Sequence, residues 1–165
     1  MALRPEALGP RVLMAACFLE LKRYENALQS LEEALQIQPD HAPARAYRGI
    51  ACMRLERYRE AREDFTRALR INPRLRPADG WKDWLGQANG AAKNWQEAAQ
   101  SFEEAIRIRP SGRRYSLLAA CYREMGNQPK ALAASKQAVG RKAEPLRGTH
   151  SSHLAPVGQP LERFL

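Results

Sequence analysis

The sequence has no apolar run long enough to cross a membrane. Its longest apolar segment, residues 12–19, is far shorter than the roughly 18 residues that a membrane-spanning helix needs. Charged Glu20, Lys22 and Arg23 follow it, where the cleavage site of a signal peptide would need small residues. We therefore expect no membrane association and interpret this segment as part of a helix in the folded domain.

Cysteine and histidine are scarce, and their spacing fits no known framework. Cys17, Cys52 and Cys121 are odd in number and far apart, which excludes a disulfide framework and a zinc pattern. His150 and His153 are three residues apart but lie in a segment without helical periodicity or a cysteine partner. We expect no metal and no cofactor. The cysteines are predicted to pack as small apolar residues in a reducing compartment, the cytoplasm or alternatively the nucleus.

Motifs of catalysis are absent as well. The chain has no Gly-rich phosphate loop and no Gly-x-Ser-x-Gly segment, and no strand pattern is present to hold a Ser/His/Asp set. A positioned nucleophile or general base is therefore missing, and the chain is not expected to be an enzyme.

What the sequence does contain is a repeat. Four alanines, at intervals of 34, 37 and 33 residues, share one local context, and a second alanine follows each of them seven residues later. Prolines close the first three units at positions 39, 73 and 110. A period near 34 indicates a helical repeat array rather than an ordinary globular core. The alanine pairs are Ala27 and Ala34, Ala61 and Ala68, Ala98 and Ala105, and Ala131 and Ala138.

Each unit reads as two amphipathic helices joined by a short turn. The units span about residues 8–41, 42–75, 79–111 and 112–140, and together form one domain over 8–140. Small residues recur in the first helices, at Gly49 and Gly86 for example, where we expect helices to cross closely beside Phe65 and Phe102. Gly140 is predicted to end the last helix, and residues 141–165 are predicted to be a disordered basic tail.

These motifs identify the family that the chain resembles. Residues 24–28, 58–61 and 95–98 each precede an Ala-[Leu/Ile]-x-Ile-x-Pro segment, and the pattern is similar to that of tetratricopeptide repeat (TPR) proteins. The resemblance implies an all-α fold, a right-handed superhelical stack of about four helix-turn-helix repeats. Arg48 departs from the pattern, because the family usually has leucine there.

The resemblance also implies a concave groove lined by the first helix of each unit. Its first half is apolar and its second half polar, which suits an amphipathic peptide helix or an extended apolar segment. The alternative is that these residues pack within the array or against a neighbouring repeat. The implied groove residues are Val12, Ala16, Leu19, Ala46, Ile50, Met53, Asp83, Gln87, Gly90, Ser116, Ala120 and Arg123.

One subclass of ligand can be tested directly in the sequence. Chaperone-binding TPR domains resemble each other in a clamp of lysine, asparagine and arginine that holds a partner's terminal carboxylate. The corresponding positions here hold side chains without charge: Val12, Ala16, Tyr47, Gly80 and Trp84. We therefore expect that the ligand is not a chaperone C-terminal carboxylate.

The net charge of +9 comes from 21 Arg and 6 Lys and is unevenly distributed. Residues 41–76 carry ten basic and four acidic residues, and residues 111–165 carry nine and three. The basic patch of the second unit could bind an acidic segment or RNA phosphates. The favoured alternative is a solvated face with local ion pairs such as Glu63 with Arg67. The patch comprises Arg54, Arg57, Arg59, Arg62, Arg67 and Arg70.

Taken together, these patterns favour a non-enzymatic scaffold or adaptor that binds a partner protein. The alternative is an RNA-associated protein that uses the arginines of the second unit.

Overall fold

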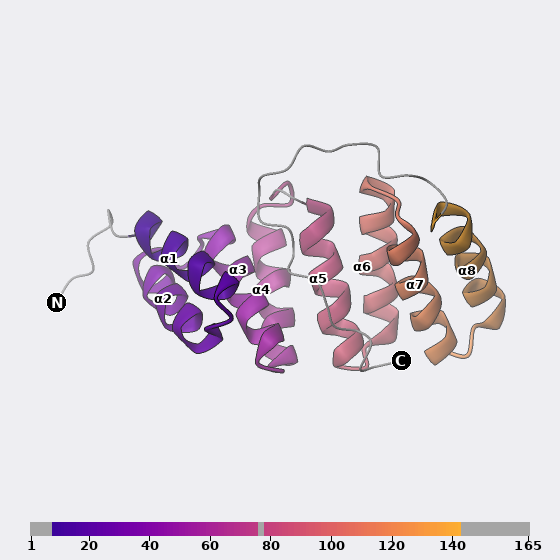
Figure 1. The fold of residues 1–165 in the computed structure, drawn as a ribbon, viewed down its shortest axis with the longest axis horizontal. Coiled ribbons are helices and arrows are strands. Elements are labelled where there is room, and N and C mark those ends of the chain that lie inside the picture. The colour runs from indigo at the N-terminus through magenta and orange to yellow at the C-terminus, as the bar shows by residue number, and fades with distance from the viewer. Residues whose placement is uncertain (1–7, 76–77, 143–165) are drawn as a thin grey trace.

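The structure is a computed structural model, and it describes residues 8–75 and 78–142. This part of the chain consists of eight helices and no strand, stacked in chain order into an elongated array (Figure 1). The predicted all-α stack of four helix pairs is thereby confirmed, while residues 143–165 of the predicted tail lie outside the described residues. The helices are α1 (Leu8–Glu20), α2 (Tyr24–Ile37), α3 (Ala42–Arg54), α4 (Tyr58–Ile71), α5 (Ala78–Ala91), α6 (Trp95–Ile108), α7 (Gly112–Glu124) and α8 (Gln128–Lys142).

Every helix contacts the next one along the chain, within a pair and between pairs. In addition, α1 contacts α3 and α3 contacts α5, so the first helices of the first three pairs lie side by side. This arrangement leaves one face of the array to the first helices, which is the face that the sequence predicts to bind a partner.

The turn inside each pair uses a left-handed residue at the same register. Lys22, Glu56 and Lys93 have φ angles of 58°, 60° and 61°, and Gly126 has 71°. In the second pair the N–H of Arg57 donates to the Cys52 carbonyl at 2.9 Å, and the other three turns make the equivalent bond. This hydrogen-bond pattern is a Schellman motif, which closes the first helix and sets the direction of the second.

The second helices of the first three pairs end two residues before a proline. They end at Ile37, Ile71 and Ile108, and the residue after each has extended backbone angles. Proline cannot continue a helix, because it lacks the N–H and clashes with the preceding turn. The fourth pair has no such proline. Its helix α8 continues to Lys142, so the prediction that Gly140 ends it was wrong.

The alanine period that defines the units marks the close crossings of helices. All eight alanines of the repeat are buried, and six of them have no exposed surface. At Gly49 and Gly86 the helix leaves no room for a Cβ atom, because these glycines face the buried rings of Phe65 and Phe102. The predicted crossings are therefore confirmed.

Buried apolar residues form two clusters. One extends over α1 to α5 and contains Phe65, Trp81 and Trp84, and the other joins α6, α7 and α8 around Phe102. Within residues 8–75 and 78–142, none of the helices combines the length and apolar character needed to cross a membrane.

Candidate interaction surface

The apolar half of the predicted groove lies on α1 and α3. Val12, Ile50 and Met53 are half-buried and pack against the first core cluster, so part of each apolar side chain remains accessible. Ala16 and Leu19 keep only 7% and 8% of their surface exposed. The accessible apolar strip of this face is therefore formed by Val12, Ile50 and Met53.

Ala46 differs from its neighbours in the predicted groove, because it has no exposed surface and belongs to the core cluster. Its position one turn before Ile50 places it on the same helix face. Because it is buried, Ala46 packs beneath the strip and is not placed to contact a partner. The prediction that Ala46 lines the groove therefore needs this correction.

The polar half lies on α5 and α7. Gln87, Gly90 and Ala120 are half-buried, whereas Ser116 and Arg123 are exposed. The Ser116 hydroxyl donates to the Gly112 carbonyl at 3.1 Å, one turn earlier in its own helix. This half therefore offers an amide group on α5 and hydroxyl and guanidinium groups on α7.

Asp83, the fourth half-buried member of the polar half, is held by a neighbouring repeat. Arg114 of α7 donates from Nε to both carboxylate oxygens at 2.8 Å and from Nη2 to Oδ2 at 2.6 Å. Arg114 is itself buried and also donates to the Arg109 carbonyl. The carboxylate of Asp83 thus joins the third and fourth pairs, and a partner would compete with Arg114 for it.

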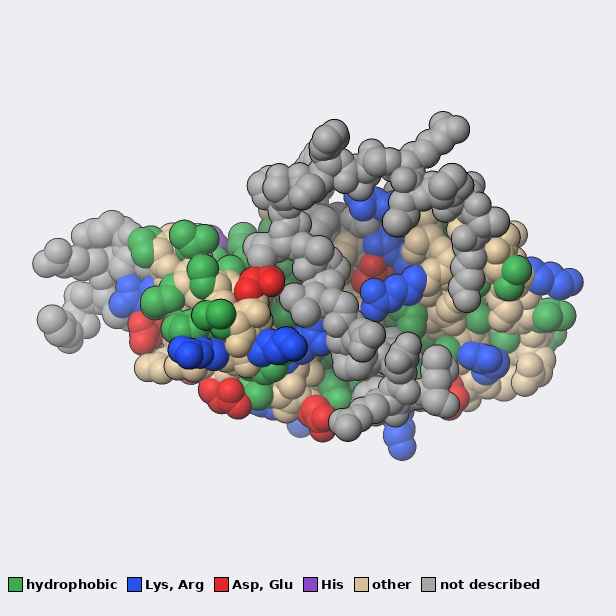
Figure 2. Space-filling model, in the orientation of Figure 1, with side chains coloured by type: hydrophobic (Ala, Val, Ile, Leu, Met, Phe, Trp, Pro, Cys, Tyr) green, Lys and Arg blue, Asp and Glu red, His purple; other side chains and the backbone are tan. Residues whose placement is uncertain are grey.

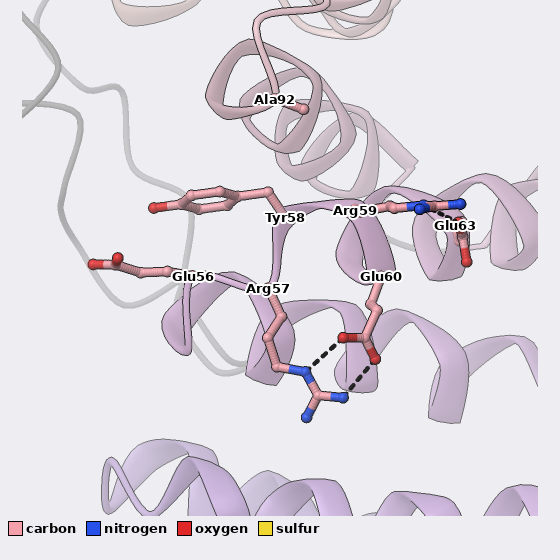
Figure 3. Close-up of a pocket in the computed structure, with 7 residues that line it drawn as sticks. All are labelled: Glu56, Arg57, Tyr58, Arg59, Glu60, Glu63 and Ala92. Atoms are coloured by element: carbon pink, nitrogen blue, oxygen red, sulfur yellow. Dashed lines mark hydrogen bonds and ion pairs between the residues drawn. The ribbon is translucent and has the colours of Figure 1, made fainter.

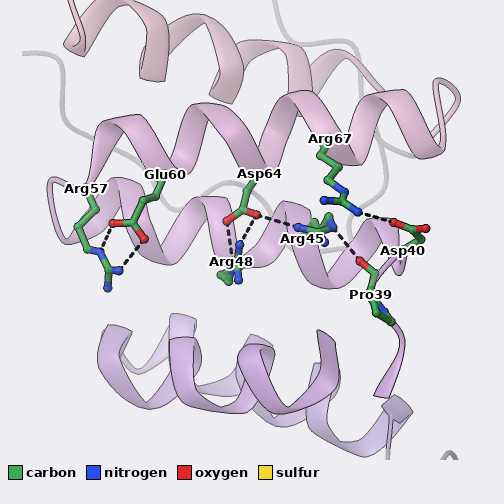
Figure 4. A network of polar contacts seen from close by, with 8 residues as sticks. All are labelled: Pro39, Asp40, Arg45, Arg48, Arg57, Glu60, Asp64 and Arg67. Carbon is green, nitrogen blue, oxygen red and sulfur yellow. Dashed lines mark hydrogen bonds and ion pairs between the residues drawn. The ribbon is translucent and has the colours of Figure 1, made fainter. Parts of the chain in front are cut away.

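A second buried ion pair explains the arginine at the usual leucine position. Arg48 donates to the two carboxylate oxygens of Asp64 at 2.7 Å each, and Arg45 approaches Asp64 at 3.5 Å (Figure 4). Asp64 is 2% exposed, and its hydrogen bonds raise the pKa of the Arg48 guanidinium. Arg45 also donates to the Pro39 carbonyl at 2.8 Å.

The sequence does carry a signal for this pair. Asp64 is three residues after Ala61, in register with Ser30 and Ser101, and those two serines are also buried. A carboxylate at a buried position needs a cation. Arg48, at a position that is usually apolar, supplies it.

The basic patch is partly neutralised by acidic neighbours. Arg57 forms two hydrogen bonds of 2.6 Å with Glu60, and Arg59 approaches Glu63 at 3.4 Å. These side chains line a shallow, open depression of about 680 Å³ at the start of α4, together with Glu56, Tyr58 and Ala92 (Figure 3). Three glutamates and two arginines line it, so the depression is not a basic site for phosphate.

The other arginines of the basic patch have different neighbours. Arg67 pairs with Asp40 at 3.0 Å, which corrects the predicted pair of Arg67 with Glu63. Arg54 lies over the Trp84 ring at 5.3 Å from its centroid. Among the residues that the structure describes, the side chains of Arg62 and Arg70 make no ion pair.

The cysteines fall into two environments. Cys52 and Cys121 are buried, and burial raises the pKa of each thiol to about 11. Cys17 is exposed, so the prediction that all three cysteines pack in the core was wrong for this one. The described residues contain no group of three or more His, Cys, Asp or Glu arranged to hold a metal ion.

An array of four stacked helix pairs with an accessible face on its first helices belongs to the class of helical repeat scaffolds. Tetratricopeptide repeat family models match residues 7–74 and residues 48–113. The chain therefore belongs to the tetratricopeptide repeat family and has the architecture of a protein-interaction scaffold.

Solved structures with this fold include several of MamA. One, a crystal structure of MamA, is 19% identical over 84% of this chain and 80% of its own, with a TM-score of 0.77. A second, MamA residues 41 to the end from Desulfovibrio magneticus RS-1, is 16% identical over 84% and 76%, with a TM-score of 0.74. At this identity the likeness shows the fold. No curated protein matches the chain.

Proposed function

We propose that this protein is a non-enzymatic scaffold that binds an apolar partner segment on the face lined by α1, α3 and α5. The observation that carries the proposal is the strip of Val12, Ile50 and Met53, whose half-buried side chains lie on two first helices in mutual contact. An amphipathic helix or an extended apolar segment would cover such a strip.

Polar groups on the following first helices would orient the partner. Gln87, Ser116 and Arg123 lie on α5 and α7 and can donate hydrogen bonds to a backbone or to acidic side chains. A terminal carboxylate is a poorer ligand, because the clamp positions hold Tyr47 and Trp84. The Trp84 ring is buried and stacked on Phe65, with centroids 6.3 Å apart.

Substitution of the apolar strip tests the proposal. Ile50→Glu and Met53→Glu each place a carboxylate on the strip, and we expect either to abolish capture of protein partners by the immobilised chain. Ile108→Glu is the matched control, because Ile108 is 51% exposed at the end of α6 and away from the strip. Circular dichroism verifies that each variant is folded. Capture that persists in folded Ile50→Glu would refute the proposed site.

The second candidate, an RNA-associated function, is supported by Arg62 and Arg70 on α4, which have no acidic partner among the described residues. Pairing of three other patch arginines with carboxylates argues against it, since those charges are already compensated. RNA binding predicts a steep salt dependence and loss on charge reversal of Arg59 and Arg62. We expect capture of partners to change little with salt and to survive that charge reversal.

A further inference from the structure

Three residues of α1 are exposed where their counterparts later in the chain are covered. Leu13 is 68% exposed and Met14 46%, and Cys17 is exposed too; we call these three the α1 end face. Helix α7 has the equivalent residues 104 positions further along the chain. They are Leu117, Leu118 and Cys121. Leu118 and Cys121 are 7% and 4% exposed, and all three pack in the cluster that α6 and α7 share. A preceding second helix therefore covers this set of positions.

The same comparison holds at the other end of the array. Leu132 and Val139 of α8 are 59% and 71% exposed, and we call this pair the α8 end face. Their counterparts in α2 are Leu28 and Leu35, which are 6% and 8% exposed beneath the next pair. A following first helix therefore covers these two positions.

The two end faces thus correspond to the two sides of the contact that joins neighbouring pairs inside the array. Between pairs inside the array, each second helix contacts the first helix of the next pair. One molecule presents both halves, at opposite ends of the stack (Figure 1). On the α1 end face of one copy, the α8 end face of another would take the place that a preceding second helix takes inside the array.

The charges of the terminal pairs favour this contact over contact between like ends. Residues 8–41 carry five acidic and three basic residues, whereas residues 112–142 carry one acidic and seven basic residues. Figure 2 shows apolar side chains gathered over the α1 end and Lys or Arg side chains at the α8 end. Opposite charges attract when an α8 end meets an α1 end, and two α8 ends repel each other.

We propose that the protein self-associates head to tail, with the α8 end face of one copy on the α1 end face of the next. Such a contact joins two different surfaces, and it does not close upon itself as a twofold dimer does. Repetition extends the helical array across copies. A scaffold of this kind would present its partner-binding face several times along one assembly.

Analytical ultracentrifugation of the full chain tests the proposal. For the wild type, we expect the average mass to rise above the 18.7 kDa monomer as concentration increases, and to fall again at high salt. Leu13→Asp blocks one end face and Leu132→Asp the other. Both side chains are largely exposed, so neither variant should impair folding. Each variant alone is expected to be monomeric, since every contact would bury an unpaired carboxylate.

A mixture of the two variants distinguishes this assembly from a symmetric one. Leu13→Asp keeps a functional α8 end face and Leu132→Asp a functional α1 end face, so the mixture should form one-to-one dimers and nothing larger. Ile108→Asp, an exposed site in the middle of the array, should associate as the wild type does. A monomeric wild type, self-association of either end-face variant alone, or a mixture that stays monomeric would overturn the proposal.

Discussion

The Phe65 ring occupies the space in front of Gly49, and this contact joins the two helices of the second pair. A Cβ atom on Gly49 would lie 2.9 Å from ring carbons of Phe65, which has no exposed surface. The third pair repeats the relationship, with Gly86 at 2.7 Å from Phe102 by the same measure. The aromatic ring, and not the backbone conformation, therefore requires glycine at these positions.

Gly49→Ala is expected to lower the free energy of unfolding by about 1 kcal/mol. Overpacking costs about 1–3 kcal/mol, and the better helix propensity of alanine offsets up to about 1 kcal/mol of that cost. Urea unfolding followed by circular dichroism measures the change. Gly90→Ala is the control, because its Cβ would make an ordinary contact of 3.5 Å with Trp95. Equal stability of the two variants would show that Phe65 yields to the added methyl group.

Arg48→Leu introduces the residue that the family usually has, yet we expect it to destabilise this chain by about 3 kcal/mol. The loss follows because the buried Asp64 carboxylate would keep only Arg45, at 3.5 Å. Thermal unfolding provides the measurement. Arg57→Leu, which breaks an exposed pair with Glu60, should cost less than about 1 kcal/mol. A loss for Arg48→Leu no larger than that of Arg57→Leu would contradict the role given to the buried pair.

The left-handed turn residues predict opposite effects of glycine and alanine. Lys93→Gly should stabilise the protein by about 0.5–1 kcal/mol, because φ is 61° there and a side chain disfavours that region. Gly126→Ala should destabilise it by about 1 kcal/mol for the same reason, since φ is 71°. Denaturant midpoints at constant slope measure both changes. Shifts of the same sign in the two variants would be inconsistent with this turn geometry.

The buried thiols predict a loss of stability at alkaline pH. Burial raises the pKa of Cys52 and Cys121 from 9.0 to about 11, so the unfolded chain loses these protons first. The stability that the two thiols contribute is fully present below pH 9 and disappears as pH rises through about 11. Thermal unfolding across this range should show a decline that is reduced in a Cys52→Ala, Cys121→Ala double variant. An identical decline in that variant would assign the effect to other groups.

The same environments predict which thiol reacts. In the dilute, monomeric folded protein, iodoacetamide should modify exposed Cys17 well before Cys52 or Cys121, because the thiolate is the nucleophile and both buried thiols stay protonated. Peptide mapping by mass spectrometry measures the three rates, and urea should make them similar. Faster labelling of Cys52 than of Cys17 in the folded state would contradict the structure.

Much of the fold could be predicted because the repeat marks its own crossings. The alanine period at Ala61 and Ala98 follows from helices that pack closely, and that requirement leaves a visible trace in the sequence. The left-handed turns were missed at Lys22 and Glu56, because these residue types rarely adopt positive φ. Their register with Gly126 was the available signal.

The candidate surface was harder to predict because burial depends on neighbours in space. Ala46 follows the same register as Ile50, yet only the latter stays accessible. Asp83 could not be paired with Arg114 from sequence, since they are 31 positions apart and helix α6 lies between their helices. The exposed Cys17 was missed for a similar reason: its counterpart Cys121 is covered by a preceding pair that α1 lacks among the described residues.

The measurement that tests the central claim most directly is one pull-down from cell lysate, with the wild type and Ile50→Glu compared with and without RNase. The account predicts a discrete set of proteins that survives RNase on the wild-type chain and is lost from folded Ile50→Glu. A set that disappears with RNase and is the same for both chains would contradict the account and assign binding to the arginines of α4.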